Sequence, residues 1–313
     1  MRDKKEYCRV RYSASQLPDA VLRLETGLPD RAIFEDVVFY VGLFKDSIVY
    51  FSGWKVEALS LEDQVLMTLM KLRKDYPYLH LAQLFHCSVA TVGNIITTFI
   101  HVLHKIFFQD LMSVVPSKEK NQLSLPASFQ NVKYKNCRMI IDCTDIEIAA
   151  PHPMDEQKQT YSAYRGMHSF KLLLGVAPNA VITYCSNLFP GSVSDKAIVQ
   201  ESGILNHFKP GDLILADKGF LISDILPHGV SVNIPPFLNN GKFTESEVRL
   251  TKSIASNRIH VERANARLKD FKILSFIPHH LRCYADAIVQ VCCVLVNMQD
   301  PLIDEIKDSL ICK

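Results

Sequence analysis

Two short apolar runs that each end in an aspartate restrict most strongly what this chain can fold into. The first, residues 138–142, reads Arg-Met-Ile-Ile-Asp, and the second, residues 212–217, reads Asp-Leu-Ile-Leu-Ala-Asp and is followed by Lys-Gly-Phe. Such a run is typical of a buried strand that delivers an acid at its edge, and the glycine after the second run marks a turn. The pattern predicts a buried sheet that carries Asp142 and Asp217 at strand ends.

A helical stretch, residues 258–269, carries a third acid, Glu262, among basic side chains. One interpretation is a solvated helix with ion pairs four residues apart, such as Arg258–Glu262, each worth about 0.2–0.5 kcal/mol. The other is a helix whose acid binds a metal while its basic residues hold a phosphate backbone. The helix itself is predicted by apolar residues at spacings of seven, three, four and three: Ile254, Val261, Ala264, Leu268 and Phe271.

Two strand-end aspartates and a helical glutamate can converge on a divalent cation. Hard cations such as Mg²⁺ prefer oxygen ligands and leave positions open for water and phosphate. A pair of such ions can activate the attacking oxygen and stabilise the leaving oxygen in phosphodiester cleavage. The three acids therefore point to a metal-dependent site that uses Mg²⁺ or Mn²⁺.

Four motifs in this order resemble the DDE transposases of the PIF/Harbinger and IS5-like group, and transposon-derived animal proteins that sometimes carry a THAP zinc finger. The resemblance spans roughly residues 60–300 and implies an RNase H-like core with the triad Asp142, Asp217 and Glu262, whose members are 75 and 45 residues apart. The motifs are Asp142-Cys-Thr, Pro190-Gly-Ser-Val-Ser-Asp195, Ala216-Asp-Lys-Gly-Phe220 and Arg258-Ile-His-Val-Glu262-Arg.

The resemblance implies a DNA endonuclease of transposase origin, in which Asp142 and Asp217 bridge two metal ions and Glu262 holds one of them. If strand transfer follows cleavage, the freed 3′-hydroxyl attacks target DNA. An alternative function is a domesticated, catalytically silent DNA-binding or adaptor protein that keeps the fold. A third is an RNA-directed or general metal phosphohydrolase on the same core.

Two further aspartates lie close to the predicted site. Asp195 is interpreted as an acid in the first turn of a helix that supports the metal ligands, with direct ligation as the alternative. Asp145 follows Asp142 by three residues, so in a regular strand its side chain points to the opposite face.

Composition limits how the chain can bind DNA. Of its 313 residues, 48% are hydrophobic and 22% charged, which is typical of a folded protein. The net charge is only +2, so any DNA contact must come from local patches. One patch, residues 242–272, has eight basic and four acidic residues, or +4. The predicted DNA-contacting residues are Ser88, Thr91, Asn94, Arg165, Lys171, Lys218, Arg258, Arg263, Arg267 and Lys269.

Residues 60–108 predict a helix-turn-helix. Ser60-Leu-Glu-Asp63 has the capping-box pattern at the start of a first helix. A short second helix is expected at about 79–85, and Ser88 begins a third. Helix, tight turn and helix is the layout that places the second of the pair in a major groove. The alternative is a three-helix subdomain that only packs against the catalytic core. Residues expected on the exposed side of the third helix are Ser88, Thr91, Asn94 and Thr98.

The predicted fold class is α/β (α+β): an RNase H-like mixed sheet with flanking helices, preceded by an all-α helix-turn-helix subdomain. The predicted strands are at about 137–149, 169–177, 180–187, 212–217 and 230–234, and the helices at 192–206, 244–270 and 281–298. The predicted domains are an N-terminal helical or irregular region 1–55, a helix-turn-helix 56–112, a linker 113–136, a DDE endonuclease domain 137–300 and a tail 301–313.

The remaining expectations concern cysteines, location and partners. None of the nine cysteines forms a CxxC pair, so a zinc knuckle is not expected. No apolar run is expected to cross a bilayer, so the protein is predicted to have no membrane partner and to lie in the nucleus, with the cytoplasm as a second place. Besides DNA, the resemblance implies a Myb-like partner protein, and a homo-oligomer is a further expectation.

Overall fold

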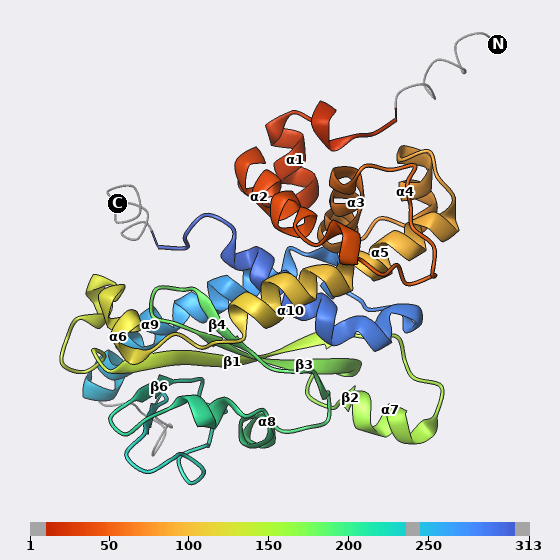
Figure 1. The fold of residues 1–313 in the computed structure, drawn as a ribbon. Helices are drawn as coiled ribbons and strands as arrows, with labels where there is room; N and C mark the ends of the chain where they lie inside the picture. The colour runs from red at the N-terminus through yellow and green to blue at the C-terminus, as the bar shows by residue number, and fades with distance from the viewer. Residues whose placement is uncertain (1–10, 236–244, 304–313) are drawn as a thin grey trace. The chain divides into compact units, whose positions relative to one another are not determined.

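The computed structural model describes residues 11–235 and 245–303, and the chain divides into two compact units (Figure 1). Residues up to 111 form the first unit together with residues 270–274 and 287–299. Most of the remaining chain, including residues 112–269, forms the second unit. The mixed α/β fold class predicted from the sequence is confirmed, with the helical part preceding the sheet.

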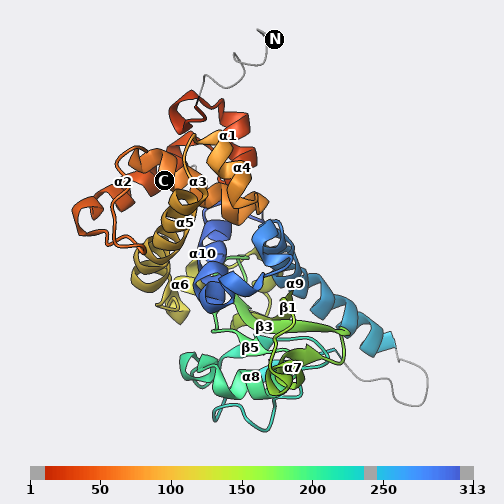
Figure 2. The same ribbon diagram turned by 90° about the vertical axis from the view of Figure 1, so that its right-hand side faces the viewer.

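The first unit contains only helices among its described residues, and Figure 2 shows α1–α5 gathered in it. The helices α1 and α2 pack against α3, so the N-terminal region belongs to this unit. Its α-helices are α1 (Asp19–Thr26), α2 (Arg31–Gly42), α3 (Leu61–Lys74), α4 (Tyr78–Leu84), α5 (Val89–Leu103) and α10 (Ala285–Asn297). Shorter helical segments of this unit are η2 (Ala14–Gln16), η3 (Lys45–Ser47), the π-helix η4 (His104–Met112) and η7 (Lys272–Leu274). The segment η8 (His279–Tyr284) belongs to the second unit.

Local capping explains the predicted helix-turn-helix of α4 and α5. The Ser88 hydroxyl accepts a hydrogen bond from the backbone N–H of Thr91 at 3.0 Å, which begins α5. His86 adopts a left-handed conformation, with φ of 51°, and reverses the chain between the helices. Ser60 caps α3 in the same way as Ser88 caps α5. Asp63 does not complete the capping box, because its carboxylate accepts hydrogen bonds from Ser13 and Ala14.

The exposed side predicted for α5 is partly wrong. Ser88 is exposed and Thr91 is half-buried, but Asn94 and Thr98 are buried. The Asn94 amide accepts a hydrogen bond from Ser52 N at 2.8 Å and donates one to the Trp54 carbonyl at 3.0 Å. Because both ends of this amide hold the loop that precedes α3, Asn94 has a structural role, and its burial contradicts the predicted exposed position.

One continuous helical stretch, Val89–Met112, is long and apolar enough by composition to cross a membrane, contrary to the sequence prediction. Half of this stretch is buried, and α5 packs against α3 and α4. A core helix of a helical unit needs the same apolar composition, because it is covered on several sides. We therefore interpret the stretch as the core helix of the first unit.

The second unit is built on a mixed sheet with the order β2-β3-β1-β6-β7, and β4 and β5 also pair with β3. β1 is antiparallel to β3 and parallel to β6, and β6 is parallel to β7. This arrangement agrees with the predicted RNase H-like sheet. The strands are β1 (Cys137–Glu147), β2 (Tyr161–Ser162), β3 (Met167–Val176), β4 (Ile182–Cys185), β5 (Phe189–Pro190), β6 (Leu213–Leu215) and β7 (Ser231–Asn233).

Helices cover both faces of this sheet, with α9 on one side of β1 and β3 and α8 on the other (Figures 1 and 2). Met139 and Ile141 of β1 belong to the buried core cluster on the α8 side, together with Ile198 of α8. Because strand side chains alternate, Ile140 and Asp142 point to the α9 side. The helices are α6 (Lys118–Leu123), α7 (Met154–Thr160), α8 (Asp195–Glu201), η6 (Ile204–His207) and α9 (Glu245–Lys269), with η5 (Ala127–Phe129) before β1.

Two segments differ from their prediction as loop or linker. Residues 113–136 contain α6, which Ser117 caps, and they pack in the second unit through the buried side chains of Phe129 and Tyr134. The stretch between the first two predicted strands, for which no helix was predicted, contains α7 (Met154–Thr160). Both helices are short and polar, so the sequence shows no apolar periodicity that would reveal them.

The burial of Asn94 generates a stability prediction. Asn94→Ala removes two hydrogen bonds and leaves the Ser52 N–H and the Trp54 carbonyl without their partner, so we expect the free energy of unfolding to fall by about 1–3 kcal/mol. Urea unfolding followed by circular dichroism measures this change. Val89→Ala, an exposed position on the same helix, is the control and should change stability by less than about 0.5 kcal/mol. Unchanged stability with weakened DNA binding would instead support a DNA contact.

Candidate active site

The parallel pairing of β1 and β6 brings the two predicted aspartates to one level of the sheet. Ile140 is paired with Leu215, and each aspartate lies two residues further along its chain. Because neighbouring strands advance by nearly the same rise per residue, Asp142 and Asp217 end side by side. Asp217 lies just after β6, where its carboxylate is exposed and accepts a hydrogen bond from the backbone N–H of Lys218 at 2.7 Å.

The helix α9 carries Glu262 one turn after an arginine that contacts Asp217. α9 packs on β1 and β3, and the five apolar residues predicted to form its buried face are all buried. Arg258, one turn before Glu262, places one guanidinium nitrogen 3.1 Å from Asp217 Oδ1 and the other 3.9 Å from Glu262 Oε1. This arginine therefore joins the second aspartate to the helical glutamate.

Asn265 joins the same helix to the first aspartate. Its amide Nδ2 donates a hydrogen bond of 2.8 Å to Asp142 Oδ2. Asn265 is buried, and its Oδ1 has no hydrogen-bond partner among the described residues. Asn265 is not among the residues predicted from the sequence. Its signal was an amide one turn after Glu262, next to the apolar face of the helix.

Burial shapes the electrostatics of Asp142. The pKa of Asp142 is raised to about 6, chiefly by loss of solvent and, to a smaller extent, by the negative charges of Asp217 and Asp195. The positive charge of Arg258 and a backbone hydrogen bond at Cys143 act in the opposite direction. Burial therefore outweighs the attraction of Arg258, and the carboxyl group of Asp142 holds its proton more tightly than a free aspartate does.

Asp195 lies next to this site at the first residue of α8. The ammonium group of Lys171 in β3 donates hydrogen bonds to Asp195 Oδ1 at 3.2 Å and to the Val193 carbonyl at 2.9 Å. The positive charge of Lys171 is therefore held inside the protein. Asp195 also contacts the thiol of Cys143, whose pKa is raised by burial. Asp145 lies opposite Lys171 in the sheet and accepts hydrogen bonds from Ser169 and Arg165.

Comparison with protein families places this geometry in context. The family model described as DDE superfamily endonuclease matches residues 141–297, from the residue before Asp142 through Glu262 and beyond. The chain belongs to this family. A second model, the helix-turn-helix of DDE superfamily endonuclease, matches residues 57–109 and so covers α3, α4 and α5.

A curated relative supports the assignment to the DDE superfamily endonucleases. The chain is 26% identical over 218 residues to a protein of Microchaete diplosiphon described as a probable transposase for insertion sequence element IS702. The match covers 69% of this chain and 72% of that protein. No solved structure gives a significant match.

The donor chemistry of this DDE endonuclease site fits a hard divalent cation. All three predicted ligands are carboxylates, and carboxylate oxygens suit Mg²⁺ and Mn²⁺. Burial raises the pKa of Asp142, and a bound cation would favour the charged form of this carboxylate. The buried Asn265 Oδ1 has no hydrogen-bond donor among the described residues, and the water of a hydrated ion would supply one. Within residues 11–235 and 245–303, however, no three acidic, histidine or cysteine side chains are already gathered at metal-binding distance.

The predicted DNA-contacting residues of the second unit fall into two groups. Arg165, Arg263 and Lys269 are exposed, whereas Lys171 bonds to Asp195 and Arg258 to the predicted triad. Lys218 is half-buried next to Asp217, and Arg267 is half-buried and donates to the Asp300 carbonyl. In the basic patch, Lys242 and the side chain of Arg249 lie outside what the structure describes. The exposed basic side chains are therefore fewer than the sequence suggested.

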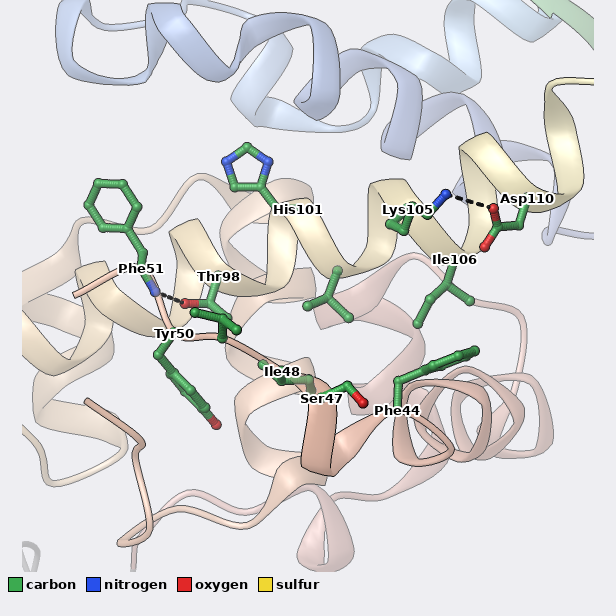
Figure 3. A pocket seen from close by; sticks show the side chains of 12 residues that line it. Phe44, Ser47, Ile48, Tyr50, Phe51, Thr98, His101, Lys105, Ile106 and Asp110 are labelled. Atoms are coloured by element: carbon green, nitrogen blue, oxygen red, sulfur yellow. Dashed lines mark hydrogen bonds and ion pairs between the residues drawn. The ribbon is translucent and has the colours of Figure 1, made fainter. Parts of the chain in front are cut away.

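An apolar cavity of about 540 Å³ lies in the first unit and holds none of the three acids (Figure 3). The chain from Phe44 to Phe51 lines one wall, and α5 with its π-helical continuation lines the other. The hydrogen bond from Phe51 N to Thr98 Oγ1 and the ion pair between Lys105 and Asp110 lie at this cavity. Its lining is mostly apolar, which suits packing and not phosphodiester chemistry.

The raised pKa of Asp142 predicts how stability depends on pH. Between about pH 4 and pH 6 the folded protein holds a proton that the unfolded chain releases, so the contribution of Asp142 to stability is present at low pH and lost as pH rises through this window. Asparagine does not ionise, so Asp142→Asn removes this pH-dependent loss of stability. The stability of the variant relative to wild type should rise by an amount on the order of 2 kcal/mol between pH 4 and pH 7.

Urea unfolding at several pH values measures this difference. Asp224→Asn is a matched control, because Lys196 lowers the pKa of Asp224 and the pH dependence should take the opposite sign. A constant difference between Asp142→Asn and wild type across the pH range would contradict the prediction.

Proposed function

We propose that the protein is a metal-dependent DNA endonuclease of transposase origin whose catalytic acids are Asp142, Asp217 and Glu262. One observation carries the proposal. In a chain of the DDE superfamily endonuclease family, side chains one turn on either side of Glu262 contact the other two acids: Arg258 contacts Asp217, and Asn265 contacts Asp142.

The three acids would hold Mg²⁺ or Mn²⁺ through their carboxylate oxygens. When bound, such ions activate a water or hydroxyl for attack on the phosphodiester and stabilise the departing 3′ oxygen. Asn265 orients Asp142 through its hydrogen bond, and the buried position of Asp142 keeps its carboxylate away from bulk water. Lys171 of β3 holds Asp195 at the first residue of α8, and the negative charge of Asp195 reaches Asp142 and raises its pKa.

Substitution of the acids tests the catalytic proposal. We expect each of three substitutions to lower the rate of Mg²⁺- or Mn²⁺-dependent nicking of supercoiled plasmid by about 100-fold or more: Asp142→Asn, Asp217→Asn and Glu262→Gln. Each removes a charged group on which transition-state stabilisation depends. Asp224→Asn, which changes an exposed acid away from the triad, should retain wild-type activity. Chelation with EDTA should abolish nicking by the wild type.

Three other outcomes would each point elsewhere. Nicking that persists in all three triad variants discards the assignment of the acids. DNA binding by the wild type without nicking in either metal supports the alternative of a domesticated, catalytically silent adaptor. Preferential cleavage of RNA or small phosphoesters supports a general metal phosphohydrolase.

DNA contact by the exposed face of α9 forms the second part of the proposal. Arg263 and Lys269 are exposed on the helix that carries Glu262, which suits contacts to phosphates beside the scissile bond. At the helix-turn-helix, the exposed Ser88 and half-buried Thr91 remain proposed contacts at the start of α5.

Salt dependence tests the role of α9. The double substitution Arg263→Gln and Lys269→Gln should reduce the slope of log K against log salt by about 2, because each lost phosphate contact removes about one released counterion. Fluorescence anisotropy with duplex DNA in EDTA measures binding without cleavage. Lys133→Gln, at an exposed lysine of the second unit, is the control. An unchanged slope in the double variant would remove α9 from the DNA interface.

The finer identity and the partners are also part of the proposal. The order of the four motifs supports membership of the PIF/Harbinger group, and a DNA substrate supports a nuclear location. A Myb-like partner protein or a second copy of the chain is proposed to bind the first unit. Its support is the apolar cavity and the exposed side chains near it, because large exposed apolar patches mark interaction surfaces. These side chains are Phe39, Leu43, Phe44, Val49 and Phe51.

A further inference from the structure

We propose that Arg258 is a built-in counter-cation that holds Asp217 and Glu262 in the metal-free protein and is displaced from Asp217 when a divalent cation binds. The inference rests on the proposed function, because it concerns the same three acids. It adds a competition inside the chain that regulates how readily the site takes up metal.

The first support is the position of the guanidinium. Its two terminal nitrogens lie 3.1 Å from Asp217 Oδ1 and 3.9 Å from Glu262 Oε1, so one positive group contacts two of the proposed metal ligands. Its charge also lowers the pKa of the third, Asp142. This positive charge contacts two of the acids and favours the charged form of the third. A bound cation would have the same effects on the three carboxylates.

The second support is an imbalance in burial. The Arg258 side chain is 10% exposed, while those of Asp217 and Glu262 are 54% and 59% exposed. Burying an arginine requires compensation by well-placed hydrogen bonds. Here Arg258 Nε is buried and has no partner among the described residues. A permanent structural bridge normally satisfies every buried donor, so this pairing is poorly built for stability alone.

The third support is that Asp217 cannot serve both cations equally well. Its Oδ1 already accepts hydrogen bonds from Arg258 and from the backbone N–H of Lys218. A divalent ion bound to the same carboxylate would lie next to a buried positive charge, and the low effective dielectric there strengthens the repulsion. In the proposed competition, the guanidinium therefore releases Asp217 when the ion binds. Once released, its charge is available for a DNA phosphate.

Metal binding to the full chain without DNA tests the proposal. Arg258→Gln keeps a polar side chain of similar reach but removes the charge. We expect it to bind Mn²⁺ at least 5-fold more tightly than wild type by isothermal titration calorimetry. It should also lower the melting temperature of the metal-free protein, while the melting temperature in saturating Mn²⁺ stays close to that of wild type. Arg258→Lys, which keeps the charge without the two-pronged geometry, should give intermediate affinity.

Two controls make the outcomes distinct. Lys133→Gln removes an exposed positive charge of the second unit outside the proposed metal and DNA sites, and should leave Mn²⁺ affinity within 2-fold of wild type. Asp217→Asn should weaken Mn²⁺ binding in every background. The same readouts apply to Arg258→Lys if Arg258→Gln does not fold.

Each adverse result has one meaning. If wild type binds Mn²⁺ and Asp217→Asn does not, but Arg258→Gln binds no more tightly, the counter-cation role is wrong and the proposed metal site stands. Equal destabilisation of Arg258→Gln with and without Mn²⁺ would likewise assign Arg258 a permanent structural role. If wild type and Arg258→Gln both fail to bind Mn²⁺, the proposed metal site fails, and the counter-cation role fails with it.

Discussion

The parallel pairing of β1 with β6 is the constraint on which the candidate site depends. It matches Ile140 with Leu215 and thereby brings Asp142 and Asp217, 75 residues apart in the chain, to one level of the sheet. A slip of one residue in this register would turn one of the two side chains to the other face. The buried apolar residues of both strands oppose such a slip, because it would move each side chain to a face that is packed for a different one. The same burial that stabilises the sheet therefore aligns the acids.

The helix α9 completes the site because one of its faces packs on the sheet and the other carries the polar residues that contact the aspartates. Its apolar face, which includes Val261, Ala264 and Leu268, is buried and fixes the rotation of the helix on β1 and β3. That rotation decides which polar residues face Asp142, which lies inside β1 and not at its predicted end, and Asp217, which follows β6. Arg258 and Asn265, seven residues apart and hence nearly two full turns, flank Glu262 and each contact one aspartate. Packing on one side of the helix thus sets the chemistry on its other side.

The sequence revealed elements with strong periodicity and missed features that depend on long-range contacts. The strands around Asp142 and Asp217 and the buried face of α9 followed from apolar patterns, and their side-by-side arrangement agreed with the family resemblance. The role of Asn265 depends on a partner 123 residues away, and no local pattern reports such a contact. Asn94 was misjudged for a related reason. Polar residues on a helix suggest exposure, but a neighbouring loop covers this one and bonds to both ends of its amide.

The contrast in exposure among the three acids follows from the same architecture. Asp142 lies inside β1, where the neighbouring strands and α9 remove water and raise its pKa to about 6. Asp217 lies just past a strand end and Glu262 on the open side of α9, and both remain more than half exposed. DNA is a wide and highly charged ligand, so it reaches the open side of the site first. In the proposed function, the buried acid provides a fixed point for the metal, while the exposed pair exchanges an internal arginine for an ion that arrives from solvent.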